Sequence, residues 1–434
     1  MAYDIIIGRD ESDKKAFGDK GLIYIGKGYV KMGNYTSLSN LIWMDVARSH
    51  VVLIAGKRGS GKSYTLGAIT EEISDLPKEV SQNIASIIFD TMGIFWTMKY
   101  KNEKEIELLQ EWGLKPKTLP VKIWVPFGYV KDYEKRQIPV DNTFALSPSE
   151  LSAEDWILTF NLKLTEPVAI LIQKVIAELS SKEFTIDNIL SQIEKQDTEK
   201  QIKNSALALF EAAKTWKIFS DSSHKPTKVS DLVEAGNTSI LDLSVYSSIG
   251  AFNIRALVIG IISRKLFNQR MLARKKEEIS AIQHGIDYLA HTEKREMPLV
   301  WIFIDEAHEF LPQNEKTPAT DALIQLLREG RQPGISLVLA TQQPGVIHRD
   351  AMTQSDIVIA HRVTSKPDTE ALNDIMQTYL LESIRKSMDD LPSLKGSAII
   401  LDDNSERIYP VRIRPRFTWH GGEAPTSIRI SKRL

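Results

Sequence analysis

The feature that most constrains the fold of this chain is the run GKRGSGKS at residues 56–63. It directly follows the apolar stretch 50–55, which reads HVVLIA and predicts a buried strand. In a loop of this spacing, glycines let backbone N–H groups turn toward an anion, and the start of the next helix adds its positive dipole end. The sequence therefore predicts a phosphate-binding loop between a strand and a helix over 63–74.

Two side chains of this loop have distinct expected tasks. Lys62 would bring a mobile positive charge to the outer phosphates of a nucleotide, and Ser63 would offer its hydroxyl to Mg²⁺. We therefore expect ATP and Mg²⁺ as cofactors. The expected nucleotide-binding residues are Gly56, Lys57, Arg58, Gly59, Ser60, Gly61, Lys62, Ser63 and Tyr64.

Short apolar runs alternate with helical patterns along most of the chain. This alternation is typical of an α/β fold with a mostly parallel sheet covered on both faces. The expected core strands lie at 50–55, 84–89, 121–125, 238–244, 299–304, 335–340, 356–360 and 397–401.

The remaining segments predict additions to this core. Residues 4–32 read as three short strands between glycines, and residues 147–235 lose the strand pattern and show helical spacing instead. The last residues alternate arginine and proline and predict an extended tail that lies across a neighbouring molecule. The expected organisation is a β element at 1–45, the ATPase core at 46–146 and 236–410, a helical insert at 147–235, and a C-terminal tail at 411–434.

Two acids, Asp305 and Glu306, follow the apolar run 299–304. We expect Asp305 to hold Mg²⁺ together with Ser63, from the end of a strand adjacent to the one that carries the loop. Glu306 would polarise the water that attacks the γ-phosphate. A second carboxylate beside the metal-binding acid favours ATP hydrolysis over phosphate transfer to a metabolite.

Polar residues after the next strands complete the expected chemistry. Gln342 would sense the γ-phosphate or orient the attacking water. Arg331 and Arg362 would stabilise transition-state charge, within one subunit or across an interface, and Arg48 is a weaker candidate for the same role. The alternative for these arginines is an ordinary surface salt bridge.

Composition excludes several classes of chemistry. The chain has no cysteine, which rules out disulfides, thiolate metal sites and cysteine nucleophiles, and its net charge of −1 provides no general attraction for nucleic acid. The first residues do not read as a signal peptide, and no stretch reaches the length of a membrane span. We expect a cytoplasmic protein without membrane contact.

Residues 305–308 spell DEAH, which is typical of two-lobed helicases, but the residues after Gln342 are too few for a second lobe. Five motifs together carry a different resemblance: GKRGSGKSYTLG (56–67), FDTMGIFW (89–96), FIDEAHEFL (303–311), LLREGRQPGISLVLATQQP (326–344) and IVIAHRVTSKPDTEAL (357–372). Through these motifs the chain resembles the HerA/FtsK superfamily of ring-forming ATPases that pump DNA, and its HerA branch most.

The resemblance implies a RecA-like core, a homohexamer that hydrolyses ATP between subunits, duplex DNA in the ring channel, and a nuclease partner such as NurA. It also places Arg331 and Arg362 at arginine positions of the family. The chain departs from the family in its short N-terminal element and at Gln343, where many relatives have arginine.

DNA would be held by loops after strand ends, and the candidates are 313–317 with Lys316, and His348 with Arg349.

Two other functions are compatible with the residues. One is an ATP-gated ring scaffold that assembles or switches a partner effector. The other is a metabolic kinase, which Glu306 disfavours. We expect His308 to pack or hydrogen-bond near the site rather than bind a metal.

Overall fold

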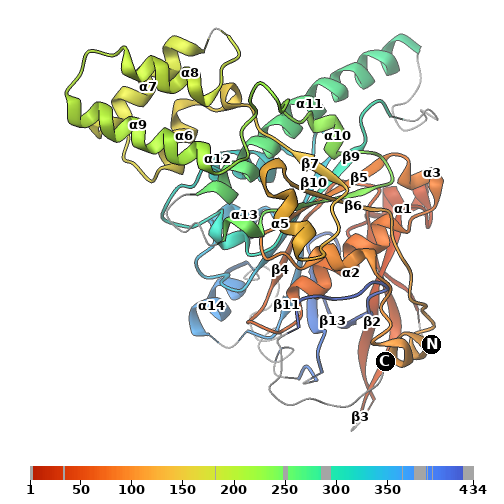
Figure 1. Cartoon of the computed structure of the whole chain (residues 1–434). Coiled ribbons are helices and arrows are strands. Elements are labelled where there is room, and N and C mark those ends of the chain that lie inside the picture. The colour runs from red at the N-terminus through yellow and green to blue at the C-terminus, as the bar shows by residue number, and fades with distance from the viewer. Residues whose placement is uncertain are drawn as a thin grey trace.

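The structure is a computed structural model that describes residues 3–32, 35–180, 182–247, 253–284, 295–363, 365–375, 388, 390–392 and 394–423. Its centre is one thirteen-stranded sheet with helices on both faces (Figure 1). The strands are β1 (Ile5–Ile7), β2 (Leu22–Met32), β3 (Tyr35–Asp45), β4 (Val51–Ala55), β5 (Ile84–Asp90), β6 (Val121–Pro126), β7 (Asn142–Phe144), β8 (Thr238–Asp242), β9 (Leu299–Ile304), β10 (Ile335–Thr341), β11 (Ile357–His361), β12 (Ser397–Asp402) and β13 (Arg407–Ile413).

The sheet has a parallel part and an antiparallel part. Its strand order is β1-β3-β2-β13-β12-β11-β4-β10-β9-β5-β8-β6-β7, and every pair from β11 to β7 is parallel. The strands β12, β13, β2 and β3 pair antiparallel on the other side. The predicted α/β fold with a mostly parallel sheet is therefore confirmed, and the carboxyl ends of β11 to β7 share one edge.

Successive apolar residues in the central strands face opposite sides, so each face has its own core. On one face, Ile54 and Phe303 pack against Leu66 and Ile69 of α2 (Lys62–Ser74). On the other face, residues such as Leu53 and Leu337 pack against α11 (Ile254–His284) and α12 (Thr320–Glu329). Full burial of each such side chain contributes about 1.5–3 kcal/mol.

The N-terminal strands differ from the prediction. The two short strands expected within 21–32 are one strand, β2, and helix α1 (Glu11–Phe17) separates it from β1. Gly26 lies inside β2 and does not end it. A Cβ at this position would lie 2.2 Å from the carbonyl oxygen of Arg412 on β13. The glycine is needed for the close approach of two paired strands rather than for a turn.

Four helices cover the segment 153–215, and in Figure 1 they gather in one lobe at the upper left, away from β2 and β3. They are α6 (Ala153–Thr159), α7 (Pro167–Leu179), α8 (Ile186–Glu194) and α9 (Lys200–Thr215). Ser152 and Thr185 begin α6 and α8 with capping boxes, in which each side chain accepts a hydrogen bond from the third backbone N–H of its helix. The stacked and edge-on rings of Trp156, Phe160 and Phe210 form the centre of this lobe.

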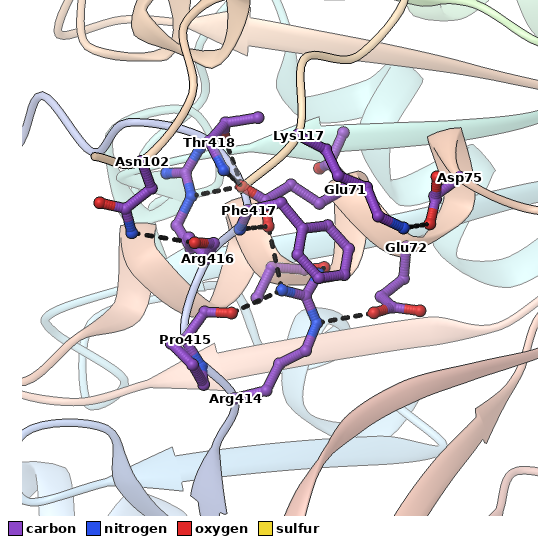
Figure 2. A network of polar contacts seen from close by, with 12 residues as sticks. Glu71, Glu72, Asp75, Asn102, Lys117, Arg414, Pro415, Arg416, Phe417 and Thr418 are labelled. Carbon is purple, nitrogen blue, oxygen red and sulfur yellow. Dashed lines mark hydrogen bonds and ion pairs between the residues drawn. The ribbon is translucent and has the colours of Figure 1, made fainter. Parts of the chain in front are cut away.

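The C-terminal residues were expected to extend across a neighbouring molecule, but those described pack on their own chain. β13 pairs with β12 and β2, and residues 414–418 then lie against α2 (Figure 2). Arg414 and Arg416 are fully buried there, with Glu71 as their shared partner. Among the described helices, none has the length and apolar character to span a membrane.

Candidate nucleotide-binding site

The loop 56–61 connects β4, which lies between the parallel strands β11 and β10, to α2. Gly59 and Gly61 have φ values of 76° and 113°, which side chains other than glycine rarely adopt. At Gly56 a Cβ would lie 2.5 Å from Ser60 Oγ and 2.7 Å from His361 Cβ. The tight shape of the loop therefore depends on these three glycines.

The neighbouring strands hold the loop through backbone hydrogen bonds. The N–H of Lys57 donates to the carbonyl oxygen of Arg362 at 3.0 Å, and that of Gly56 donates to Thr341 at 3.3 Å. Because Arg362 follows β11 and Thr341 ends β10, the loop is tied to the strands on both sides of β4.

His361 lies against the loop, and no role was predicted for it from the sequence. Its ring is fully buried, with Nδ1 3.0 Å from the carbonyl oxygen of Ser397 and Nε2 2.9 Å from Thr65 Oγ1. A carbonyl only accepts, so Nδ1 carries the proton and Nε2 accepts from the Thr65 hydroxyl. Burial lowers the pKa of His361 to about 4, which keeps the ring neutral. The only signal in the sequence was its place at a strand end, inside the motif IVIAHRV.

Lys62 and Ser63 lie at the start of α2 and face the acids after β9. Lys62 is 6% exposed, and its Nζ lies 3.4 Å from the carbonyl oxygen of Lys57. Burial lowers its pKa, although the nearby Glu306 and Asp305 act in the opposite direction. The Ser63 hydroxyl donates to Asp305 Oδ2 at 2.5 Å. The two residues expected to bind the metal therefore meet.

The expectation that Asp305 follows the strand adjacent to β4 is wrong. The order β4-β10-β9 places β10 between them. Ser63 still reaches Asp305, because α2 starts above the sheet and its first turn extends across β10 toward β9. Asp305 is 2% exposed, and burial raises its pKa against the effect of the Ser63 hydrogen bond.

Glu306 has an unusual backbone conformation and an unusual environment. It adopts φ 52° and ψ 42°, in the left-handed region, next to Asp305 at the end of β9. Its Oε2 is buried and has no hydrogen-bond partner among the described residues, and His308 Nδ1 lies 3.6 Å away. Burial, with the charge of Asp305 as the second cause, raises the pKa of Glu306 to about 7. His308 Nδ1 also lies 3.2 Å from Thr341 Oγ1, so this ring is near the site as expected.

Gln342 follows β10, the strand between the loop and the acids. It is half-buried, and within the part of the chain that the structure describes its side-chain amide makes no hydrogen bond. The strand order thus places an unengaged amide between the phosphate loop on one side and Glu306 on the other.

The three candidate arginines lie in different places. Arg362 follows β11 beside the loop, and its Nη2 lies 3.4 Å from the carbonyl oxygen of Leu391. Arg331 precedes β10 at the opposite, amino edge, where its exposed side chain pairs with Asp356 at 3.0 Å. Arg48 pairs with Asp13 at 2.7 Å. Of the three, only Arg362 is placed beside the loop of its own chain.

A second pair of acids at the same edge was not assigned a role from the sequence. Asp90 and Asp242 end the neighbouring strands β5 and β8 in matching register, and both are buried. Asp90 accepts hydrogen bonds from the backbone N–H groups of Gly93 and Phe95, both at 2.7 Å. Burial and the charge of Asp242 raise the pKa of Asp90 to about 8. Asp90 shapes the loop that follows β5. The sequence feature that could have identified Asp90 is its place in the motif FDTMGIFW.

The residues present fit a magnesium-bound triphosphate. The loop offers backbone N–H groups, and the buried hydroxyl of Ser60 has no hydrogen-bond partner among the described residues. No group of three or more acidic or histidine side chains in the described residues could hold a metal ion alone. Mg²⁺ commonly takes one or two protein ligands together with phosphate oxygens and water, and Ser63 with Asp305 matches that pattern.

Comparisons with known proteins indicate the family and the fold of this chain. Residues 30–266 match the family model described as "Helicase HerA, central domain". Proteins described as "DNA double-strand break repair helicase HerA" are similar: that of Pyrococcus furiosus is 27% identical over 184 residues, 39% of this chain and 31% of that protein. That of Saccharolobus solfataricus is 23% identical over 379 residues, 85% of this chain and 64% of that protein. The chain thus covers less than two thirds of these relatives.

A solved structure shows the same fold. VirB4 of Thermoanaerobacter pseudethanolicus superposes with a TM-score of 0.55 at 12% sequence identity, covering 91% of this chain and 96% of that one. At this identity the likeness concerns the arrangement of helices and strands alone.

Proposed function

The chain belongs to the family defined by the HerA helicase central domain, and from this premise we propose that it is an ATPase that uses ATP hydrolysis to move DNA. One observation carries the proposal. The candidate catalytic residues and the candidate DNA loops extend from the same two strands. Glu306 and the loop 313–317 follow β9, while Gln342 and the loop 343–349 follow β10.

Each residue of the site has a separate role in the proposed hydrolysis. The loop N–H groups and Lys62 bind the phosphates, and Ser63 with Asp305 holds Mg²⁺, which neutralises charge on the outer phosphate oxygens when bound. Glu306, in its deprotonated form, accepts the proton of the attacking water. Gln342 orients that water with its side-chain amide.

The two candidate DNA loops lie side by side. The N–H of Gln313 donates to the carbonyl oxygen of Val346 at 2.9 Å, and that of His348 donates to Leu311 at 2.7 Å. A conformational change at Glu306 or Gln342 therefore has only a few residues to cross before it reaches two loops that are hydrogen-bonded to each other. We propose that these loops contact DNA phosphates in the channel of a homohexameric ring, with a nuclease as a further partner.

The arginines fit such a ring at two different positions. Arg362 lies beside the loop of its own chain, whereas Arg331 lies on the opposite edge of the sheet with its side chain 73% exposed. We propose that Arg331 reaches the nucleotide of a neighbouring subunit, whereas Arg362 acts on the nucleotide bound to its own chain.

The ATPase rate with and without linear duplex DNA, at low and moderate salt, tests the proposal when the mass in solution is recorded alongside. We expect salt-sensitive stimulation of a six-subunit species. The double variant Lys316→Ala, Arg349→Ala should lose the stimulation, and Lys200→Ala, an exposed lysine of α9, is the matched control. A well-formed ring that DNA does not stimulate would contradict the DNA motor.

One observation favours the ring scaffold as a second candidate. Lys316 is already paired with Asp321 at 3.0 Å, which reduces the free positive charge of the loop 313–317. For an ATP-gated scaffold, turnover should respond to a protein partner and not to DNA, so adding each separately to the same ATPase assay distinguishes the two functions.

A further inference from the structure

The C-terminal segment 414–418 is fixed rigidly on the helix that begins with the phosphate-binding residues. Glu71 of α2 accepts hydrogen bonds from Arg414 Nη1 at 3.0 Å and Arg416 Nε at 2.9 Å (Figure 2). The backbone N–H groups of Phe417 and Thr418 donate to the same carboxylate at 2.9 and 3.0 Å. All of these partners are buried, so the position of the segment relative to α2 is set by one charged cluster.

This attachment brings His420 beside Tyr64, the residue directly after Ser63. The two rings meet edge to face, with centroids 5.2 Å apart and an interplanar angle of 77°. The Tyr64 hydroxyl accepts from the N–H of Arg416 at 2.7 Å and donates to Glu105 at 3.0 Å. The tyrosine ring is therefore held in one orientation.

His420 has a ring N–H group without a hydrogen-bond partner in the described part of the chain. Its Nδ1 lies 3.2 Å from Arg416 Nη1, and because a guanidinium only donates, Nδ1 is the acceptor. Burial, followed by the charge of Arg416, lowers the pKa of His420 to about 4, so the ring is neutral and its proton is on Nε2. Within the described residues Nε2 has no hydrogen-bond partner.

The orientation of α2 points this ring pair toward the nucleoside end of a nucleotide. Successive residues of a helix differ by about 100° in direction, so Ser63 faces Asp305 while Tyr64 faces the segment that carries Arg416. Hydrolysis places the γ-phosphate beside Glu306 and Gln342. The other end of the nucleotide must then leave the loop on the side of Tyr64, where Gly421 and Gly422 follow His420 without side chains.

We propose that Tyr64, His420 and the glycines 421–422 form the subsite for the ribose and base of ATP. One ring of the pair stacks its face on the base, while His420 Nε2–H donates to a base nitrogen or a ribose oxygen. This inference rests on the proposed ATPase function, because it takes the position of the phosphates from it.

The dissociation constants of wild type and His420→Ala, for ATP and for inorganic tripolyphosphate, test the subsite. We expect the variant to bind ATP about tenfold more weakly, with the affinity for tripolyphosphate unchanged, since that ligand has no nucleoside. His224→Ala is the matched control, because His224 also stacks on an aromatic ring, that of Phe127, but lies in the segment after the helical lobe. An unchanged ATP affinity, or an equal loss for both ligands, would overturn the inference.

Photolabelling of the wild-type protein with 8-azido-ATP keeps the inference testable if the variant fails to fold. Peptide mapping should find the label within 416–423 or at Tyr64, and a label elsewhere in the chain would overturn the subsite. A wild-type protein that binds tripolyphosphate and ATP equally well would also overturn the subsite while leaving the phosphate loop in place. Binding of neither ligand would overturn the proposed ATPase function as well.

Discussion

Glu306 is the residue whose chemistry depends most on its position. The backbone turn at φ 52° places it at the end of β9, and burial beside Asp305 raises its pKa to about 7. A carboxyl with a pKa near the working pH is a better proton acceptor than an ordinary glutamate, and about half of it remains deprotonated at that pH. The environment of Glu306 therefore suits a general base.

We expect Glu306→Gln to bind ATP as tightly as wild type and to hydrolyse it at least about 100-fold more slowly, because the amide cannot accept the proton. Equilibrium binding of ATP and the steady-state hydrolysis rate check both parts. Glu309→Gln is the control, since Glu309 lies three residues further on, at the surface, paired with Arg255. A variant that no longer binds ATP would contradict the role of a base.

His50 is a second residue with a strongly altered charge state. It is buried between Asp356, 2.7 Å from Nδ1, and Asp45, 3.1 Å from Nε2. Burial alone would lower its pKa, but the hydrogen bonds and charges of the two aspartates outweigh it and raise the pKa to about 9. The folded protein therefore holds a proton on His50 at pH values where the unfolded chain has released it.

This difference predicts how stability depends on pH. The contribution of His50 is complete below pH 6.5, its ordinary pKa, and is lost as the pH rises through about 9. The free energy of unfolding of wild type should thus fall more steeply between these values than that of His50→Gln, by up to about 3 kcal/mol. Urea unfolding at several pH values measures both slopes, and His224→Gln should keep the wild-type slope. Equal slopes in wild type and His50→Gln would disprove the buried imidazolium.

At the scale of elements, α2 joins the site to the end of the chain. Its first turn carries Lys62, Ser63 and Tyr64, and two turns later Glu71 binds Arg414 and Arg416. Gly67 lies on the same face of α2 as Glu71. A side chain has no room at this position, because a Cβ would lie 2.5 Å from Arg416 Nη1. The helix therefore depends on contacts from a segment that is remote in sequence.

We expect Glu71→Gln to lower the free energy of unfolding by about 3–5 kcal/mol, because it leaves buried guanidinium groups without their main counter-charge. Urea denaturation at neutral pH measures this loss. Glu211→Gln, on the exposed face of α9, is the control and should change stability by less than about 0.5 kcal/mol. A loss below about 1 kcal/mol would show that Glu72, which also pairs with Arg414, compensates for Glu71.

Most elements could be predicted from the sequence, because their signals are local. The buried strands β4, β5, β9 and β10 are continuous apolar runs, and the loop spacing identified the start of α2. The strand β3, the short β7 and helix α1 were missed, since their residues lack a clear period. The pairing of β13 with β2 was also beyond the sequence, because no local pattern relates segments nearly 400 residues apart.

The residues of the candidate site also divide into those with a local signal in the sequence and those whose roles depend on distant partners. Lys62, Ser63, Asp305 and Glu306 were identified because each follows a strand or a glycine loop, and the structure brings them together. His361, Asp90 and Asp242 were not given roles, since their importance lies in burial and in partners on other strands. His420 could not have been connected to Tyr64 from the sequence, as their contact depends on the route of the whole chain.

At the scale of the whole molecule, the two candidate arginines occupy opposite edges of the sheet. β10 separates Arg331 at its amino end from Gln342 at its carboxyl end, a distance of about 20 Å for a strand of this length. One chain cannot bring Arg331 to its own phosphate loop without unfolding the strand. An arginine finger from Arg331 therefore requires a second copy.

This geometry predicts complementation between two inactive variants. Lys62→Ala should abolish hydrolysis, and Arg331→Ala should reduce it at least about 100-fold, yet mixed rings should recover activity. In such a ring an intact loop on one subunit can face an intact Arg331 on the next. The hydrolysis rate of the mixture, compared with each variant alone, is the measurement. Arg328→Ala, which removes a nearby exposed arginine paired with Asp350, is the control, and a mixture without recovery would contradict action across the interface.

The cluster around Glu71 also has a consequence for biosynthesis. A ribosome reaches residues 414–418 about 20 to 70 seconds after Glu71, at ordinary rates of elongation. Until then the nascent helix has a carboxylate whose burial has no counter-charge, so α2 cannot adopt its final packing. The loop 56–61 and α2 are therefore made early, but α2 reaches its final packing only after residues 414–418 have been made.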